Sequence, residues 1–279
     1  MSAATLSHNP TPKVDNMDGI APMKRRMTLP TEPKRQDPIY IPAEKPASDP
    51  AHGAAFILVH GLGDNAEGLQ AVPQQFQSAH KLPYMHWIIP NAMESREAMT
   101  TAWYTPSSFS TFPPDRPELA PEEDADGMLA TVKYIESLID ACTKKGIPPN
   151  RIVLGGFSQG CAMALLTDLT SEKYAGKLGG IVGLMGYLPL SAGRKLEDMR
   201  AVAGLPPVHG QVPILLARGK KDQMIPGRIW KDTLKRLEEL GVGSDLEVHE
   251  YEGLGHSLSG PVLRDICTFV ERYVPALED

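Results

Sequence analysis

Short apolar runs alternate along the chain with segments in which apolar residues recur at helical spacing. The runs lie at residues 54–61, 85–90, 151–157, 179–187 and 212–219, and a segment of alternating polarity lies at 246–251. Their length is typical of strands, and unbroken apolar character is typical of strands buried on both faces of a sheet. The pattern therefore predicts a sheet of six strands, five of them buried on both sides.

Helical patterns separate most of these strands. Between residues 126 and 146 apolar side chains recur every three or four positions, and Gly146 follows as a C-terminal cap. The segments 226–241 and 259–273 show the same periodicity. Strands that alternate with helices need crossover connections, so we expect an α/β fold with a mostly parallel central sheet and helices on both faces.

The two ends of the chain differ in composition. Residues 1–36 are polar, basic and rich in proline, so we expect a flexible tail there and a single domain at 37–279. Within the tail, the sequence Arg25-Arg26-Met27-Thr28 fits the short pattern that basophilic kinases recognise, although a solvated cluster of charges produces the same pattern by chance. A second Pro-rich segment, at 105–124, is a long connection of the kind that is usually functional or disordered.

The overall composition excludes several classes of protein. A chain of 279 residues with 42% apolar and 22% charged residues can form one large core, and its net charge of −6 gives no general attraction for nucleic acid. The cysteines, Cys142, Cys161 and Cys267, lack metal-ligand spacing, so we expect buried, reduced thiols. We find no apolar run of about 18 residues and no signal-peptide pattern. We therefore expect a cytoplasmic protein without an integral membrane segment, with a nuclear pool as an alternative.

One hydroxyl group lies where a predicted strand turns into a helix. Ser158 is the centre of a GxSxG pattern that begins at Gly156 and ends at Gly160. A side chain on such a sharp turn projects from the end of the strand, and the glycines leave room for closely packed backbone. The pattern alone also recurs in glycine-rich turns, but a strand before it and a helix after it indicate a nucleophile elbow.

A serine nucleophile needs a base and an acid, because its hydroxyl is unreactive at neutral pH. In this kind of fold the chain order is Ser, then Asp or Glu, then His, each after a strand. Asp222 and His256 follow the fifth and sixth strands and fit this order, with a turn-capping aspartate and a surface histidine as the structural alternatives. His249 lies inside a strand, and His60 precedes the serine, where we expect it to order the following loop.

Attack on a carbonyl group also creates an oxyanion, which needs preorganised N–H donors. The backbone N–H of Gln159, next to the nucleophile, is one candidate. A second is expected from the glycine-rich loop at residues 60–68. A phosphate cradle is the alternative for this loop, but the loop lacks a GK[ST] ending and the spacing of a dinucleotide fingerprint.

Together these segments resemble the acyl-protein thioesterase and carboxylesterase family of α/β-hydrolases. The resemblance is carried, in order, by "LVHGLGDNAEG", "NRIVLGGFSQGCAMAL", "GYLPL", "KKDQMIP" and "YEGLGHS", and it covers about residues 38 to 275. It implies an α/β-hydrolase fold, a triad of Ser158, Asp222 and His256, and an oxyanion hole formed by the backbone amides of Leu62 and Gln159. It also makes Leu62 and Trp103 candidates for substrate contact, and it implies neither a metal nor a cofactor.

Members of this family hydrolyse thioesters on S-acylated proteins, and also lysophospholipids and small esters. The resemblance therefore implies an acyl-protein (palmitoyl-protein) thioesterase with lysophospholipase and carboxylesterase activity, and transient contact with a membrane surface fits such substrates. The chain departs from the family at residues 93–105, which are more polar and contain Trp-Tyr-Thr in place of Trp-Phe-Asp, and in its long connections at 105–124 and 191–211. A carboxylesterase for short-chain or aromatic esters is therefore an alternative, and a non-catalytic binding protein on a hydrolase scaffold is a third.

Overall fold

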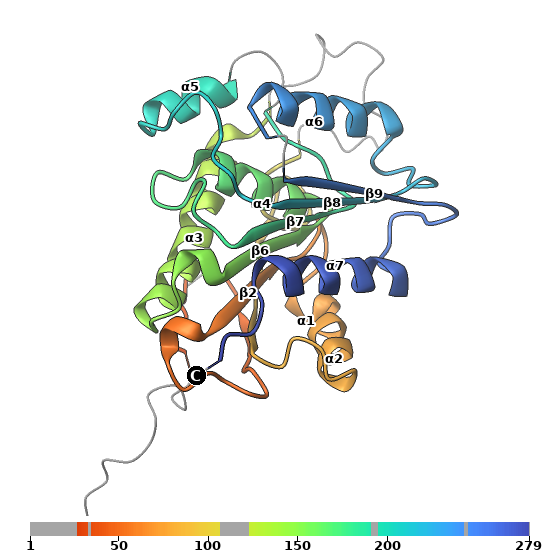
Figure 1. The fold of residues 1–279 in the computed structure, drawn as a ribbon. Helices are drawn as coiled ribbons and strands as arrows, with labels where there is room; N and C mark the ends of the chain where they lie inside the picture. Colours follow the sequence, from red (N-terminus) through yellow and green to blue (C-terminus); the bar gives the residue numbers. More distant parts are fainter. Residues whose placement is uncertain (1–26, 33–34, 107–122, 191–194, 243–244, 279) are drawn as a thin grey trace, which may run out of the picture.

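The structure, a computed structural model, describes residues 27–32, 35–106, 123–190, 195–242 and 245–278 (Figure 1). Residues 1–26 of the expected tail and most of the expected 105–124 loop lie outside the described residues.

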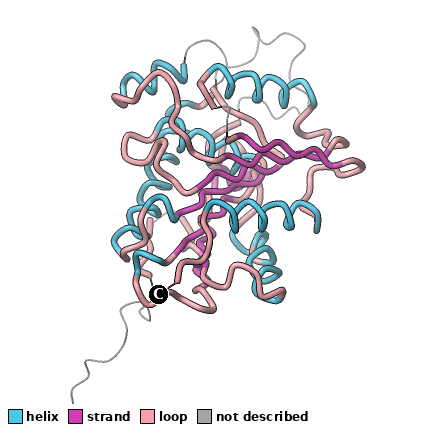
Figure 2. Tube along the Cα trace, viewed as in Figure 1, coloured by secondary structure: helices cyan, strands magenta, loops and turns pink. Residues whose placement is uncertain are grey.

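The described part of the chain contains a central sheet of seven strands, shown in magenta between cyan helices in Figure 2. These strands are β1 (Ile39–Ile41), β2 (Ala54–Val59), β3 (Met85–Ile89), β6 (Ile152–Phe157), β7 (Gly180–Leu184), β8 (Ile214–Gly219) and β9 (Leu246–Tyr251). Their order is β1-β3-β2-β6-β7-β8-β9, with β1 antiparallel to β3 and all other neighbours parallel. The six predicted strands and the mostly parallel sheet are confirmed. The additional edge strand β1 is only three residues long, which gives too short a pattern to recognise in the sequence.

The helices form two groups on opposite faces of this sheet (Figure 1). One face is covered by α3 (Ala125–Lys144), α4 (Gln159–Thr170), α5 (Lys195–Val202) and α6 (Gly227–Glu239), and the other by α1 (Ala66–Leu69), α2 (Ala71–Ser78) and α7 (Gly260–Tyr273). Short 3₁₀ helices lie at η2 (Pro50–His52) and η4 (Pro149–Arg151), and a separate hairpin consists of β4 (Met93–Ser95) and β5 (Thr100–Ala102). As predicted, Gly146 follows α3 with a positive φ of 93°.

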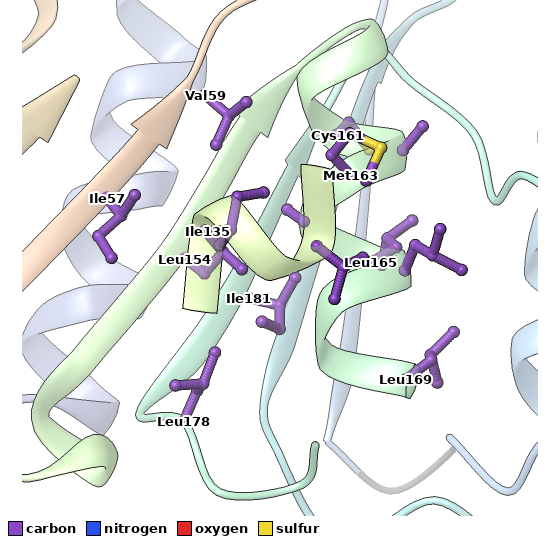
Figure 3. Close-up of a cluster of buried hydrophobic side chains, with 14 of the residues drawn as sticks. Ile57, Val59, Ile135, Leu154, Cys161, Met163, Leu165, Leu169, Leu178 and Ile181 are labelled. Atoms are coloured by element: carbon purple, nitrogen blue, oxygen red, sulfur yellow. The ribbon is translucent and has the colours of Figure 1, made fainter. Parts of the chain in front are cut away.

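The core is divided between these two faces by the alternation of side chains along each strand. In β2, Ile57 and Val59 belong to the cluster under α3 and α4, whereas Phe56 and Leu58 belong to the cluster under α2 and α7. Figure 3 shows the first cluster, to which β2 contributes Ile57 and Val59, α3 contributes Ile135, and α4 contributes Leu165 and Leu169. All twelve residues of α4 are buried, including the polar residues Gln159, Thr167, Asp168 and Thr170. The helix that follows the candidate nucleophile is therefore the centre of this half of the core.

The sequence predicted that the domain begins at residue 37. In the structure, the described chain is already packed against the domain at residue 27. Met27 is only 5% exposed, and its sulfur lies 3.8 Å from the thiol of Cys142 on α3. The guanidinium carbon of Arg35 lies 3.9 Å above the centre of the Tyr134 ring, also on α3. The described residues 27–32 and 35–36 are thus part of the domain and not of a flexible tail. The polar composition of these residues gave no indication of either contact, the apolar one of Met27 with Cys142 or the cation–π contact of Arg35 with Tyr134.

Candidate active site

Ser158 occupies a strained turn between β6 and α4. Its φ of 54° and ψ of −117° lie in a region that residues with a side chain rarely adopt. The flanking glycines make the turn possible: a Cβ on Gly160 would lie 2.1 Å from the carbonyl oxygen of Val59, and a Cβ on Gly156 would lie 2.1 Å from that of Gly160. The local geometry that we expected for a nucleophile elbow is therefore present.

Asp222 and His256 form a hydrogen-bonded pair at the ends of β8 and β9. The Nδ1 atom of His256 lies 2.7 Å from Oδ2 of Asp222, whose side chain is fully buried. The other carboxylate oxygen accepts the backbone N–H groups of Met224 at 2.8 Å and Ile225 at 3.0 Å. Burial raises the pKa of Asp222, but the hydrogen bonds from His256 and from these two amides outweigh it and leave the pKa below its ordinary value.

This pairing determines the role that His256 can play. An ionised carboxylate can only accept hydrogen bonds, so Nδ1 of His256 carries the hydrogen, and in the neutral imidazole Nε2 is the atom with the lone pair that can accept a proton. The imidazole also lies beside the elbow, because its ring centre is 4.9 Å from that of Phe157, the residue before Ser158. The side chain of His256 is 19% exposed, so a substrate can reach it.

The loop after β2 lies directly against Ser158. A Cβ on Gly61 would be 3.2 Å from Cβ of Ser158 and 3.3 Å from the ring of Phe157, which is tighter than an ordinary contact. The sequence between β2 and α1 therefore brings main chain, and not a side chain, up to the candidate nucleophile.

His60 fixes the direction of this main chain. Its Nε2 atom accepts the backbone N–H of Ala92 at 3.0 Å, so the hydrogen lies on Nδ1, which donates to the carbonyl oxygen of Gly61 at 2.8 Å. Burial lowers the pKa of His60, which favours this neutral form. In a trans peptide the C=O and N–H groups point in opposite directions, so holding the Gly61 carbonyl also sets the direction of the Leu62 N–H.

Gln159 and Trp103 support the same loop. The side chain of Gln159 accepts the backbone N–H of Trp103 and donates to the carbonyl oxygen of Tyr104, both at 2.9 Å. The indole N–H of Trp103 in turn donates to the carbonyl oxygen of His60 at 2.7 Å. Trp103 is only 3% exposed, so its ring supports the loop from within the protein, and the substrate contact that we expected for it lacks an accessible surface. The sequence suggested only a backbone role for Gln159; its amide side chain, placed before an apolar stretch at the start of α4, was the signal for a second role.

Exposed apolar side chains occur on three loops near the candidate active site. Leu62 is 42% exposed on the loop after β2, Met224 is 50% exposed on the loop that carries Asp222, and Met99 is 83% exposed on the β4–β5 hairpin. The hairpin is joined to the loop after β2 because Gly63 N–H donates to the carbonyl oxygen of Thr101 at 2.9 Å. An apolar substrate group would find favourable surface on such residues.

Other kinds of site lack support in the described part of the chain. It contains no group of three or more His, Cys, Asp and Glu side chains placed to hold a metal ion, and none of its helices is long and apolar enough to cross a membrane. The predicted free thiols are confirmed: Cys142, Cys161 and Cys267 are buried and unpaired. Burial raises the pKa of Cys161 to about 12, so this thiol, although close to the elbow, is a poor nucleophile.

Comparison with known proteins agrees with the fold and with the sequence motifs. Residues 44–274 match the Phospholipase/Carboxylesterase family. The chain is 34% identical over 239 residues to acyl-protein thioesterase 1 of Yarrowia lipolytica, covering 84% of this chain and 97% of that protein. It is 33% identical over 229 residues to acyl-protein thioesterase 1 of Gibberella zeae, covering 80% of this chain and 92% of that one.

Solved structures give the same result at the level of the fold. Arabidopsis thaliana SOBER1 superposes with a TM-score of 0.65 at 26% identity, covering 79% of this chain and 99% of that one. Zea mays acyl-protein thioesterase 2 superposes with a TM-score of 0.65 at 24% identity, covering 85% of this chain and 98% of that one. With the family match extending over most of the chain, these similarities identify the protein as a member of the phospholipase/carboxylesterase family, with an α/β-hydrolase fold.

Proposed function

We propose that the protein is a serine hydrolase that cleaves thioester or ester bonds with Ser158 as nucleophile, His256 as general base and acid, and Asp222 as the group that orients His256. The observation that carries this proposal is the strained turn at Ser158 beside an imidazole whose Nδ1 is held 2.7 Å from a buried carboxylate. Membership of the phospholipase/carboxylesterase family supports it.

The proposed reaction has two halves. His256 Nε2 takes the proton of Ser158 as the hydroxyl oxygen attacks the carbonyl carbon, and the resulting imidazolium is stabilised by Asp222. The backbone N–H groups of Leu62 and Gln159 stabilise the oxyanion. His256 then returns the proton to the leaving thiolate or alkoxide, which leaves an acyl group on Ser158. Water, activated by His256, attacks this acyl-enzyme and releases the carboxylic acid.

For the substrate, we propose an acylated protein, with lysolipids and small esters as further substrates. The names of the relatives from Yarrowia lipolytica and Gibberella zeae support this substrate class, and so do the exposed apolar side chains of Leu62, Met99 and Met224. We further propose that this hydrolysis takes place in the cytoplasm, and transient contact with a membrane surface fits the acylated-protein and lysolipid substrates.

A carboxylesterase for short-chain or aromatic esters is the second candidate. The segment at residues 93–105 is polar, and it contains the β4–β5 hairpin, which is joined to the loop after β2 by the hydrogen bond from Gly63 N–H to the Thr101 carbonyl oxygen. A polar segment so close to the loop that contacts Ser158 favours a smaller or more polar acyl group than a long alkyl chain.

One experiment separates these candidates and the non-catalytic alternative. The full chain is treated with a fluorophosphonate probe, and its hydrolysis of p-nitrophenyl esters of increasing chain length is compared with that of an S-palmitoylated peptide. Ser158→Ala removes the nucleophile, and Ser137→Ala on α3 is the matched control. Activity confined to short esters would exclude the thioesterase, and failure of the probe to label Ser158 would favour a binding protein.

A further inference from the structure

The first described residues of the chain form a strap along α3, which we define as residues 27–32 and 35–37. Met27 is anchored at one end against Cys142, and Arg35 at the other end lies over the Tyr134 ring and donates to the carbonyl oxygen of Asn91 at 2.8 Å. The strap is attached mainly by these side chains and has little regular structure of its own. Segments held in this way commonly open locally while the rest of a domain stays folded.

Thr28 is the exposed residue of the strap that follows the Met27 anchor. It lines a hollow of about 370 Å³ together with Lys144 and Lys145, which lie at the C-terminal end of α3. An acidic residue, Asp140, also lines this hollow, but its carboxylate is bound to Lys173 at 2.9 Å and to the hydroxyl group of Tyr174. Thr28 therefore shares an open space with two cationic side chains, and the nearby negative charge is already compensated.

The sequence before Thr28 supplies a second, independent observation. Arg25 and Arg26 precede it at the positions three and two residues upstream, which is the pattern of a basophilic kinase substrate. We propose that Thr28 is a phosphorylation site and that its phosphate pairs with Lys144 and Lys145, so that phosphorylation fastens the strap to α3. This modification is separate from the proposed hydrolase reaction and does not depend on it.

The proposed step is an ordinary phosphoryl transfer from ATP. The hydroxyl oxygen of Thr28 forms a bond to the γ-phosphorus, the bond between that phosphorus and the β,γ-bridging oxygen breaks, and ADP leaves. The hydroxyl proton passes to the catalytic carboxylate of the kinase. At neutral pH the product carries a charge of about −1.5 to −2, and its oxygens are strong hydrogen-bond acceptors.

Burial of Met27 determines when the kinase can act. Because Met27 lies between the two arginines and Thr28 and is only 5% exposed, a kinase can bind this sequence in extended form only while the strap is detached. When the strap returns, the phosphate meets Lys144 and Lys145. The C-terminal dipole of α3 opposes a negative charge there, but a pair of full positive charges outweighs a partial negative charge of about one half. Phosphorylation should therefore shift the strap toward its bound position.

The test uses the full chain and the catalytic subunit of cyclic-AMP-dependent protein kinase with Mg-ATP. Mass spectrometry should find one phosphate on Thr28, none in Thr28→Ala, and a strongly reduced amount in the double variant Arg25→Ala/Arg26→Ala. Met27→Ala should be phosphorylated faster, because it weakens the anchor. Hydrogen exchange of the strap should become about threefold to tenfold slower on phosphorylation, the range expected for one or two partly exposed ion pairs.

The lysines distinguish this proposal from an incidental modification. In Lys144→Ala/Lys145→Ala, Thr28 should still be phosphorylated but the strap should exchange at the unmodified rate. The control Lys231→Ala/Lys235→Ala removes two exposed lysines from α6 and should keep the full effect. Absence of phosphate on Thr28 in Met27→Ala, where the strap is loosened, would overturn the modification site. Equal slowing with and without Lys144 and Lys145 would overturn their role.

Discussion

The direction of the Leu62 N–H depends on one imidazole, so substitution of His60 should impair turnover more than substrate binding. His60→Leu removes both the donor to the Gly61 carbonyl at 2.8 Å and the acceptor of the Ala92 N–H at 3.0 Å. His60→Asn retains an N–H donor close to the position of Nδ1 and loses only the acceptor. The expected order of turnover is wild type, then His60→Asn, then His60→Leu.

The magnitude follows from what each variant leaves unpaired. Loss of one oxyanion donor lowers kcat by about 10²-fold to 10³-fold. In His60→Leu the Leu62 N–H is misdirected but still present, so kcat should fall by up to that amount. His60→Asn should lose roughly tenfold or less. Because His60 is fully buried, each unpaired backbone group also costs about 1 to 3 kcal/mol of stability, so His60→Leu should unfold at lower urea concentration.

The assay must separate turnover from folding. Active sites are counted with the fluorophosphonate probe, and kcat and KM for p-nitrophenyl acetate are then measured per labelled site below the unfolding transition, with Trp103→Phe as a second variant that loses the bond to the His60 carbonyl. KM should change little while kcat falls. A folded His60→Leu protein with kcat within about twofold of the wild type would refute the idea that His60 orients the oxyanion donor.

Three further predictions concern the elbow and the triad. Ser158→Ala should lower kcat by roughly 10⁴-fold to 10⁶-fold without changing the thermal unfolding temperature by more than a few degrees, and calorimetry together with an ester assay checks both. Asp222→Asn should lower kcat by about 10⁴-fold. The pKa of Asp222 is lowered in the folded protein, so its negative charge stabilises the fold above the pKa of the unfolded chain, which is about 4. This contribution is lost as the pH falls through the pKa of the folded protein. The difference in urea midpoint between wild type and Asp222→Asn should therefore shrink from pH 6 toward about pH 3. Gly160→Ala should lower stability by more than about 3 kcal/mol or prevent folding, because its Cβ would lie 2.1 Å from the Val59 carbonyl oxygen; a urea midpoint equal to that of the wild type would contradict the close approach.

The strands were predicted correctly because each leaves a strong local pattern in the sequence, and the proposal of the candidate triad uses the same patterns. A parallel strand buried on both faces is an unbroken apolar run, as in β2 and β8, and the site residues follow the ends of such runs. The order of elements therefore predicted that Asp222 and His256 lie at the same edge of the sheet, where the structure shows them hydrogen-bonded to each other.

The side-chain interactions that hold the loops of the site in place were harder to predict, because they join segments that are distant in the sequence. The bonds from Gln159 to residues 103 and 104, and the position of Arg35 over Tyr134, involve residues that no periodic pattern connects. The hairpin of β4 and β5 has three residues in each strand, too few for a recognisable alternation. The tail boundary was placed too late for the same reason: polar composition does not reveal that Met27 fills a gap beside Cys142.

The complete burial of α4 also bears on how this protein can change over evolutionary time. Each of its twelve residues has neighbours on every side, so almost any replacement along that helix disturbs the interior and is selected against. Variation is tolerated instead at exposed positions such as Leu62, Met99 and Met224. Changes in acyl specificity should thus arise from substitutions in the loops, while the segment that begins at Ser158 should vary little among proteins that evolve from this one.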